Sequence, residues 1–129
     1  MKFNNLNETG SETNPEKAEK AEKLLEMSVK DIKNNTSRLS EFFRYLPELD
    51  ECKYQSFAEI QFGDGTRILY YKDDGIYWRR ESYKGYFRSR DEMKLDNDPE
   101  KVSKNFSSEL APECYVVLKV NGNSSSFSI

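Results

Sequence analysis

The chain has 129 residues, of which 33% are charged, and its formal net charge is −3. The near balance of acidic and basic residues argues against a general binder of polyanions, and the 13% aromatic content argues against a fully disordered chain. No apolar run resembles a secretion signal or reaches the length of a membrane span. We therefore expect a cytoplasmic protein that does not contact membranes.

The N-terminal third of the chain predicts a mobile tail followed by helix. Residues 1–13 are polar and patternless, which is typical of a disordered tail, so a single domain is expected over 14–129. Asn14-Pro15 is a helix-start signal, and Pro47 should end the helix. Between them, apolar residues recur at helical spacing. The pattern indicates either one long amphipathic helix or two helices that break near Asn34-Asn35.

The same segment also carries a three-four spacing of the kind found in coiled coils. Ser28 and Asn35 interrupt this seam, and its first two positions are only alanine, so we favour a helix packed on a sheet. A homodimer through the N-terminal helix is the alternative. The seam positions are Ala18, Ala21, Leu25, Ser28, Ile32, Asn35, Leu39, Phe42 and Leu46.

From Tyr54 onward the apolar pattern changes to a period of two, which indicates β-strands. Turn signals recur at Asp64-Gly65, Asp74-Gly75 and Lys84-Gly85, and they predict a four-stranded antiparallel meander over residues 54–92.

The C-terminal part predicts a short helix and a hairpin. Asp98-Pro99 should begin the helix, and Val102 and Phe106 fall on one face of it. Asn121-Gly122 should be the turn of the final hairpin. The expected fold is therefore α+β, with a long N-terminal amphipathic helix packed on an antiparallel sheet made of a four-stranded meander and a C-terminal hairpin.

Two-residue turns also predict which side chains share a face of the sheet. One extra residue in any turn would move side chains to the opposite face. With two-residue turns throughout, the core face holds Ala58, Ile60, Phe62, Leu69, Tyr71, Trp78 and Phe87. The opposite face then holds Phe57, Tyr70, Tyr77, Tyr83 and Tyr86, with Lys72, Arg79, Arg88 and Arg90 among them.

Catalytic and metal-binding patterns are weak in this sequence. It contains no histidine, which removes the commonest general base and metal ligand, and two separated cysteines cannot form a structural zinc site alone. Asp74 with Glu92-Met93-Lys94 imitates a metal-dependent nuclease pattern, but Glu51-Cys52-Lys53 matches the same short pattern. We expect a non-enzymatic protein without cofactor or metal, whose cysteines are reduced.

The exposed tyrosine and arginine face is the predicted binding surface, because these residue types are enriched at protein interfaces. We favour a protein partner, so that the chain would act as an inhibitor, immunity protein, adaptor or counter-defence protein of bacterial or phage origin. A single-stranded nucleic acid stacked on the same face is the alternative, and a merely solvated sheet face is the third interpretation. A small-ligand pocket between helix and sheet is the fourth. The predicted partner-binding residues are Tyr70, Tyr77, Arg79, Tyr83, Tyr86, Arg88 and Arg90.

Overall fold

The computed structural model describes residues 14–50, 54–83 and 86–129, with the backbone alone at positions 14 and 86–91. The tail expected at residues 1–13 and the cysteine at position 52 lie outside this range. Cys114 is buried and free.

The N-terminal segment is neither one helix nor two. Met27 is extended, and Ser28 starts a new helix through a capping box, in which its hydroxyl accepts the Asp31 amide and the Asp31 carboxylate accepts the Ser28 amide. Of the two alternatives, the chain takes the one that breaks at Asn34-Asn35, and the predicted end before Pro47 is confirmed. The elements are α1 (Asn14–Lys23), the 3₁₀ helix η2 (Leu24–Glu26), α2 (Val29–Lys33) and α3 (Ser37–Tyr45).

The remaining elements confirm the α+β class with an antiparallel sheet. Their bounds are β1 (Phe57–Gln61), β2 (Thr66–Asp73), β3 (Ile76–Tyr83), β4 (Tyr86–Lys94), α4 (Pro99–Ser108), β5 (Tyr115–Val120) and β6 (Asn123–Ser128). The strands form one sheet in the order β4-β3-β2-β1-β5-β6, and each neighbouring pair is antiparallel.

Several local predictions hold because short-range chemistry decides them. The two-residue turns at Asp74-Gly75 and Asn121-Gly122 are confirmed, since all four residues have positive φ and both hairpins pair in the expected register. Helix α4 begins as predicted: the Asp98 side chain accepts the Glu100 amide at 3.0 Å, and Pro99 is its first residue.

The first turn of the meander differs from the prediction by one residue. The Phe62 amide donates to the Thr66 carbonyl at 2.9 Å, which makes a three-residue loop with Gly65 at φ 96°. Gln61 therefore pairs with Arg67, one position away from the register that a two-residue turn would give. Because side chains alternate along a strand, this single residue reverses the face of β2 and β3 relative to β1.

The pairing of β3 with β4 is also irregular. Ser82 pairs with Phe87 as predicted, but Arg80 pairs with Glu92, so two steps along β3 correspond to five along β4. Since β3 pairs regularly with β2 throughout, the extra residues belong to a bulge in β4.

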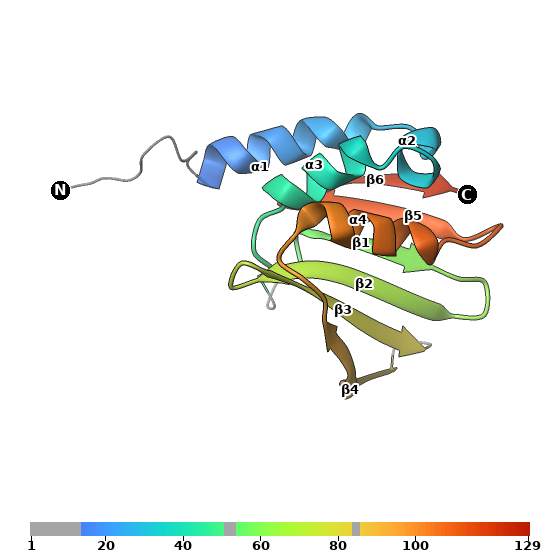
Figure 1. Ribbon diagram of the computed structural model, residues 1–129. Helices are drawn as coiled ribbons and strands as arrows, with labels where there is room; N and C mark the ends of the chain where they lie inside the picture. Colours follow the sequence, from blue (N-terminus) through green and yellow to red (C-terminus); the bar gives the residue numbers. More distant parts are fainter. Residues whose placement is uncertain (1–13, 51–53, 84–85) are drawn as a thin grey trace.

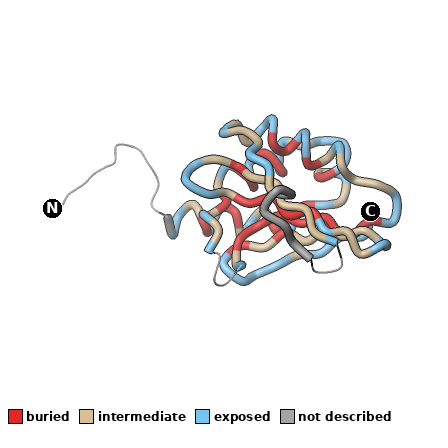
Figure 2. The backbone as a smooth tube through the Cα atoms, turned by 90° about the horizontal axis from the view of Figure 1, so that it is seen from below, coloured by how far each residue is buried: buried red, intermediate tan, exposed pale blue. Residues whose placement is uncertain are grey.

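The helices lie on one side of the sheet, and the main hydrophobic core fills the space between them (Figure 1). Buried segments run through the central strands and the inner sides of the helices (Figure 2). At the centre of this core, Phe43 contacts Tyr70, Tyr77, Phe42 and Phe106 through their rings, at centroid distances of 5.8–6.1 Å. We call this side the helix-covered face and the other the helix-free face.

Candidate functional site

The helix-free face carries its own apolar cluster, separate from the main core. Phe57, Leu69 and Tyr71 are its buried members, contributed by β1 and β2, and Trp78 of β3 and Val117 of β5 pack against them. The observed register brings them together, because Leu69 pairs with Glu59 and Tyr71 pairs with Trp78. No helix of the described chain covers this cluster, and two of its buried members, Phe57 and Leu69, line a pocket through which another molecule can reach them.

Arg80 of β3 organises the polar part of this face. Its guanidinium donates to the Tyr54 hydroxyl at 2.7 Å and to the Glu92 carboxylate at 2.8 Å. It also lies over the rings of Tyr54 and Tyr71, at 5.9 and 5.0 Å from their centroids. The Tyr71 hydroxyl donates to the same Glu92 carboxylate. Residues from β2, β3, β4 and the segment before β1 are thus joined in one network.

This network fixes the protonation states of its members. Burial raises the pKa of Tyr71, and its hydrogen bond to Glu92 raises it further. Burial works against ionisation of Glu92, but the hydrogen bonds from Tyr71 and Arg80 and the charge of Arg80 outweigh it and lower the pKa of Glu92. At neutral pH the site therefore contains a neutral phenol, a carboxylate and a guanidinium.

A second arginine pair lies beside the first. Arg67 donates two hydrogen bonds to Glu59, at 3.1 and 3.0 Å, and the Gln61 amide donates to the same carboxylate at 2.7 Å. The Glu59 side chain is buried, whereas the Arg67 side chain is 50% exposed, so the group that solvent reaches is the cation.

Between these groups lies a pocket of about 380 Å³ with an apolar floor and polar walls. Volumes of a few hundred Å³ suit one large side chain or a small ligand. Its exposed charge is the Arg67 guanidinium, so it favours an apolar or aromatic group that is accompanied by a carboxylate. The lining residues are Tyr54, Phe57, Glu59, Arg67, Leu69, Arg80 and Ser82.

The corresponding network on the helix-covered face is an internal one. Arg79 forms a two-pronged pair with Glu109, with contacts of 2.6–3.0 Å, and Glu109 also accepts a hydrogen bond from the Tyr70 hydroxyl. The Asn105 amide donates to that hydroxyl at 2.6 Å. Burial and the Glu109 carboxylate both raise the pKa of Tyr70. These contacts fasten α4 and the turn after it to β2 and β3.

The predicted partner-binding face is therefore wrong in its central members. Tyr70 and Tyr77 are fully buried, and the Tyr77 hydroxyl donates to the Phe43 carbonyl. Arg79 is half-buried and paired with Glu109. The cause is the three-residue loop after β1, which places these side chains beneath the helices.

The other predicted residues have different outcomes. Tyr83 is 51% exposed, on the same side of β3 as Tyr77. The side chains of Tyr86, Arg88 and Arg90 lie outside the described residues, although the backbone places all three on edge strand β4.

The sequence prediction missed the residues that line the helix-free face. Tyr71, Trp78 and Leu69 were assigned to the core, and Arg80 and Tyr54 were not considered for binding. The signal that could have found them is Gly63. Glycine stands on both sides of Asp64, so the sequence permits a three-residue loop, and that loop puts these residues on the helix-free face.

Two further kinds of feature are absent from the part of the chain that the structure describes. No three Cys, Asp or Glu side chains there form a group that could hold a metal ion. None of the described helices has the length and apolar character to span a bilayer.

Comparison of the chain with protein-family models, curated proteins and solved structures gives no match. Its function therefore has to be inferred from its own geometry.

Proposed function

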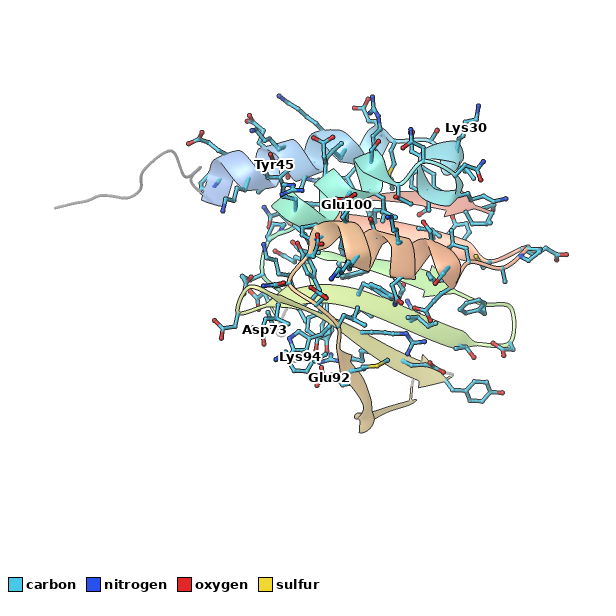
Figure 3. The ribbon with its side chains drawn as sticks, viewed as in Figure 1. Lys30, Tyr45, Asp73, Glu92, Lys94 and Glu100 are labelled. Atoms are coloured by element: carbon cyan, nitrogen blue, oxygen red, sulfur yellow. The ribbon has the colours of Figure 1, made fainter. Side chains whose placement is uncertain are left out.

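We propose that the protein binds another protein through the helix-free face of its sheet. The observation that carries this proposal is the apolar cluster of Phe57, Leu69 and Tyr71, which lies on the side of the sheet away from the helices. Asp73, Glu92 and Lys94 lie on the same side and give it a charged margin (Figure 3). An aromatic centre, arginines and a polar margin are the usual composition of an interface.

The partner should present an apolar or aromatic side chain next to a carboxylate. The pocket floor offers apolar contact through Phe57 and Leu69, and Arg67 offers a half-exposed guanidinium at its edge. Tyr54, which is 41% exposed, forms a further aromatic wall. The small net charge of −3 agrees better with such local recognition than with binding of a polyanion.

Binding is a better use of this site than catalysis. A general acid or base works best when its pKa lies near the ambient pH. Here Glu92 is held ionised by Arg80 and Tyr71, and the two arginines are each tied to a carboxylate. We therefore propose a non-enzymatic binding protein of the inhibitor, immunity, adaptor or counter-defence type, acting in the cytoplasm.

The matched variants Tyr54→Ala and Tyr83→Ala test which face binds. Both remove one exposed tyrosine, Tyr54 beside the pocket of the helix-free face and Tyr83 from the other side of β3. A partner isolated from the source cell and then purified should bind Tyr83→Ala like the parent and bind Tyr54→Ala about tenfold more weakly, since a hot-spot side chain contributes roughly 1–2 kcal/mol or more.

The single tryptophan gives an independent readout. Trp78 packs against the cluster of the helix-free face, so partner binding there should change its fluorescence emission. Partner binding without a change in Trp78 emission, or loss of binding in Tyr83→Ala alone, would contradict the proposal. A signal produced instead by a single-stranded oligonucleotide, with steep weakening by salt, would favour nucleic acid as the ligand.

A further inference from the structure

A second pocket, of about 570 Å³, lies on the helix-covered side of the sheet and is separate from the proposed interface. It is bounded by the first turn of α1, the end of α3 with the residues that follow it, β2, and the turn between β5 and β6. Its volume is in the range of small-molecule sites. Its lining residues are Pro15, Lys17, Ala18, Tyr45, Leu46, Pro47, Glu48, Lys72 and Asn121.

Two lysines, Lys17 and Lys72, line this pocket. Lys72 of β2 is half-buried, with its Nζ 5.6 Å from the ring centroid of Tyr77. Among the described residues, no carboxylate forms an ion pair with Lys72 or Lys17. Burial lowers the pKa of Lys72, which the Glu48 charge opposes, and the nearby charge of Lys17 lowers it further.

The carboxylate in the pocket wall is already engaged. Glu48 accepts the backbone amides of Asp74 and Gly75, with the Gly75 contact at 3.4 Å, and so holds the turn between β2 and β3. Asp73 projects from the other side of the sheet, with the side chains of Glu92 and Lys94 (Figure 3). The Glu48 charge persists and offsets one of the two lysines, so the pocket keeps an excess of one positive charge at a partly desolvated site.

Two like charges in one pocket repel each other, and an anion between them removes the repulsion. The positive end of the α1 dipole lies at the same pocket and adds to the attraction. The remaining wall is largely apolar, since Leu46, Pro47 and the Tyr45 ring contribute to it. A ligand that matches both parts has an acidic group at one end and a flat or apolar body at the other.

We propose that this pocket binds a small organic anion, with its phosphate or carboxylate group between Lys17 and Lys72 and its apolar body against Tyr45, Leu46 and Pro47. The site is independent of the protein interface, because it lies on the opposite side of the sheet. The chain would then have two ligands, a protein partner on the helix-free face and a small organic anion on the helix-covered side.

Phenyl phosphate, benzoate, inorganic phosphate and uncharged phenol are suitable probes. Titration of the full chain, followed by calorimetry and by the NMR signals of the lysine side chains, should show binding of at least one of the two aromatic anions. The ratio of phenyl phosphate to benzoate affinity then identifies the acidic group preferred. Inorganic phosphate should bind more weakly because it lacks the apolar body, and phenol should not bind.

Lys72→Met keeps the length of the apolar stem and removes the charge, so it should fold and bind the preferred anion about tenfold more weakly. Lys72→Arg keeps the charge and should retain part of the affinity. Lys30→Met is the control, because Lys30 lies on α2 at the opposite end of the helical layer from Tyr45 (Figure 3). It should bind like the parent.

Three results would overturn the proposal. One is the absence of binding by either aromatic anion at millimolar concentration. Another is equal affinity of phenol and phenyl phosphate, which would make the pocket a purely apolar one. The third is a folded Lys72→Met protein, verified by circular dichroism, that binds the anion as tightly as the parent.

Discussion

The two faces of the sheet contain the same residue types in different roles. On the helix-covered face, Tyr70, Tyr77 and Arg79 are fastened to α3 and α4 by hydrogen bonds to Glu109 and to the Phe43 carbonyl. On the helix-free face, tyrosines and arginines form a comparable network that borders an open pocket. Tyrosine and arginine content alone therefore does not identify a binding surface. The position of the helices decides which network is internal and which can meet a partner.

Truncation of one phenylalanine on each face should give the largest difference in the free energy of unfolding. Phe106→Ala should lower the free energy of unfolding by about 3–5 kcal/mol, because Phe106 is fully buried among other rings and leaves a cavity. Phe57→Ala should cost less, about 1.5–3 kcal/mol, since this buried side chain lines a pocket that water can fill, and no closed cavity remains. Urea unfolding followed by circular dichroism measures both, and equal losses would contradict the distinction between the faces.

Loss of an arginine–glutamate pair should also lower the free energy of unfolding by different amounts on the two faces, but the difference should be smaller than for the phenylalanines. Glu109→Gln removes the bidentate partner of the half-buried Arg79 and leaves it only the more exposed Glu81, so it should cost about 2 kcal/mol. Glu59→Gln removes the partner of Arg67, which is 50% exposed and can be solvated by water, so the loss should be about 1 kcal/mol or less. The same unfolding measurement applies. A larger loss for Glu59→Gln would mean that the helix-free pair has the greater structural role.

Alkaline pH should destabilise the protein through tyrosines on both faces. Burial raises the pKa of Tyr70, Tyr71 and Tyr77 above the ordinary value of 10.0. Below that value the phenols are neutral in both folded and unfolded chains. As the pH rises past it, only the unfolded chain loses protons, so the free energy of unfolding falls.

Replacing a tyrosine by phenylalanine shows how much of this alkaline loss of stability comes from each face of the sheet. Tyr77→Phe and Tyr71→Phe should each reduce the drop in stability between neutral pH and about pH 11, as measured by urea unfolding at both values. An unchanged drop in Tyr77→Phe would show that Tyr77 ionises in the folded protein and is less buried than its position under α3 implies.

The smallest effects are expected for the two exposed tyrosines that test binding. Tyr54→Ala and Tyr83→Ala should each change the free energy of unfolding by less than about 0.5–1 kcal/mol, since Tyr54 is 41% and Tyr83 51% exposed. The two variants should therefore have similar thermal unfolding midpoints. When they do, a difference in their affinity for the partner identifies the binding face. A strongly destabilised Tyr54→Ala protein would instead assign Tyr54 a structural role, through its hydrogen bond with Arg80.

The sequence by itself determined the features that depend on a few neighbouring residues. The Asp74-Gly75 and Asn121-Gly122 turns need positive φ, which asparagine, aspartate and glycine adopt most readily, and they set the register of their hairpins. Asp98-Pro99 likewise sets the start of α4. The α+β class followed from the change of apolar period near Tyr54.

Only the tertiary structure decided which face of the sheet is the core. Strands β2 and β3 are aromatic on both sides, with Tyr70 and Tyr77 on one and Tyr71 and Trp78 on the other, so their own pattern does not choose between them. The choice came from β1, through a loop one residue longer than its Asp-Gly signal suggested, and from the helices that bury the side of Ala58 and Ile60. Because strand side chains alternate, one residue in one turn moved the proposed binding surface to the opposite face.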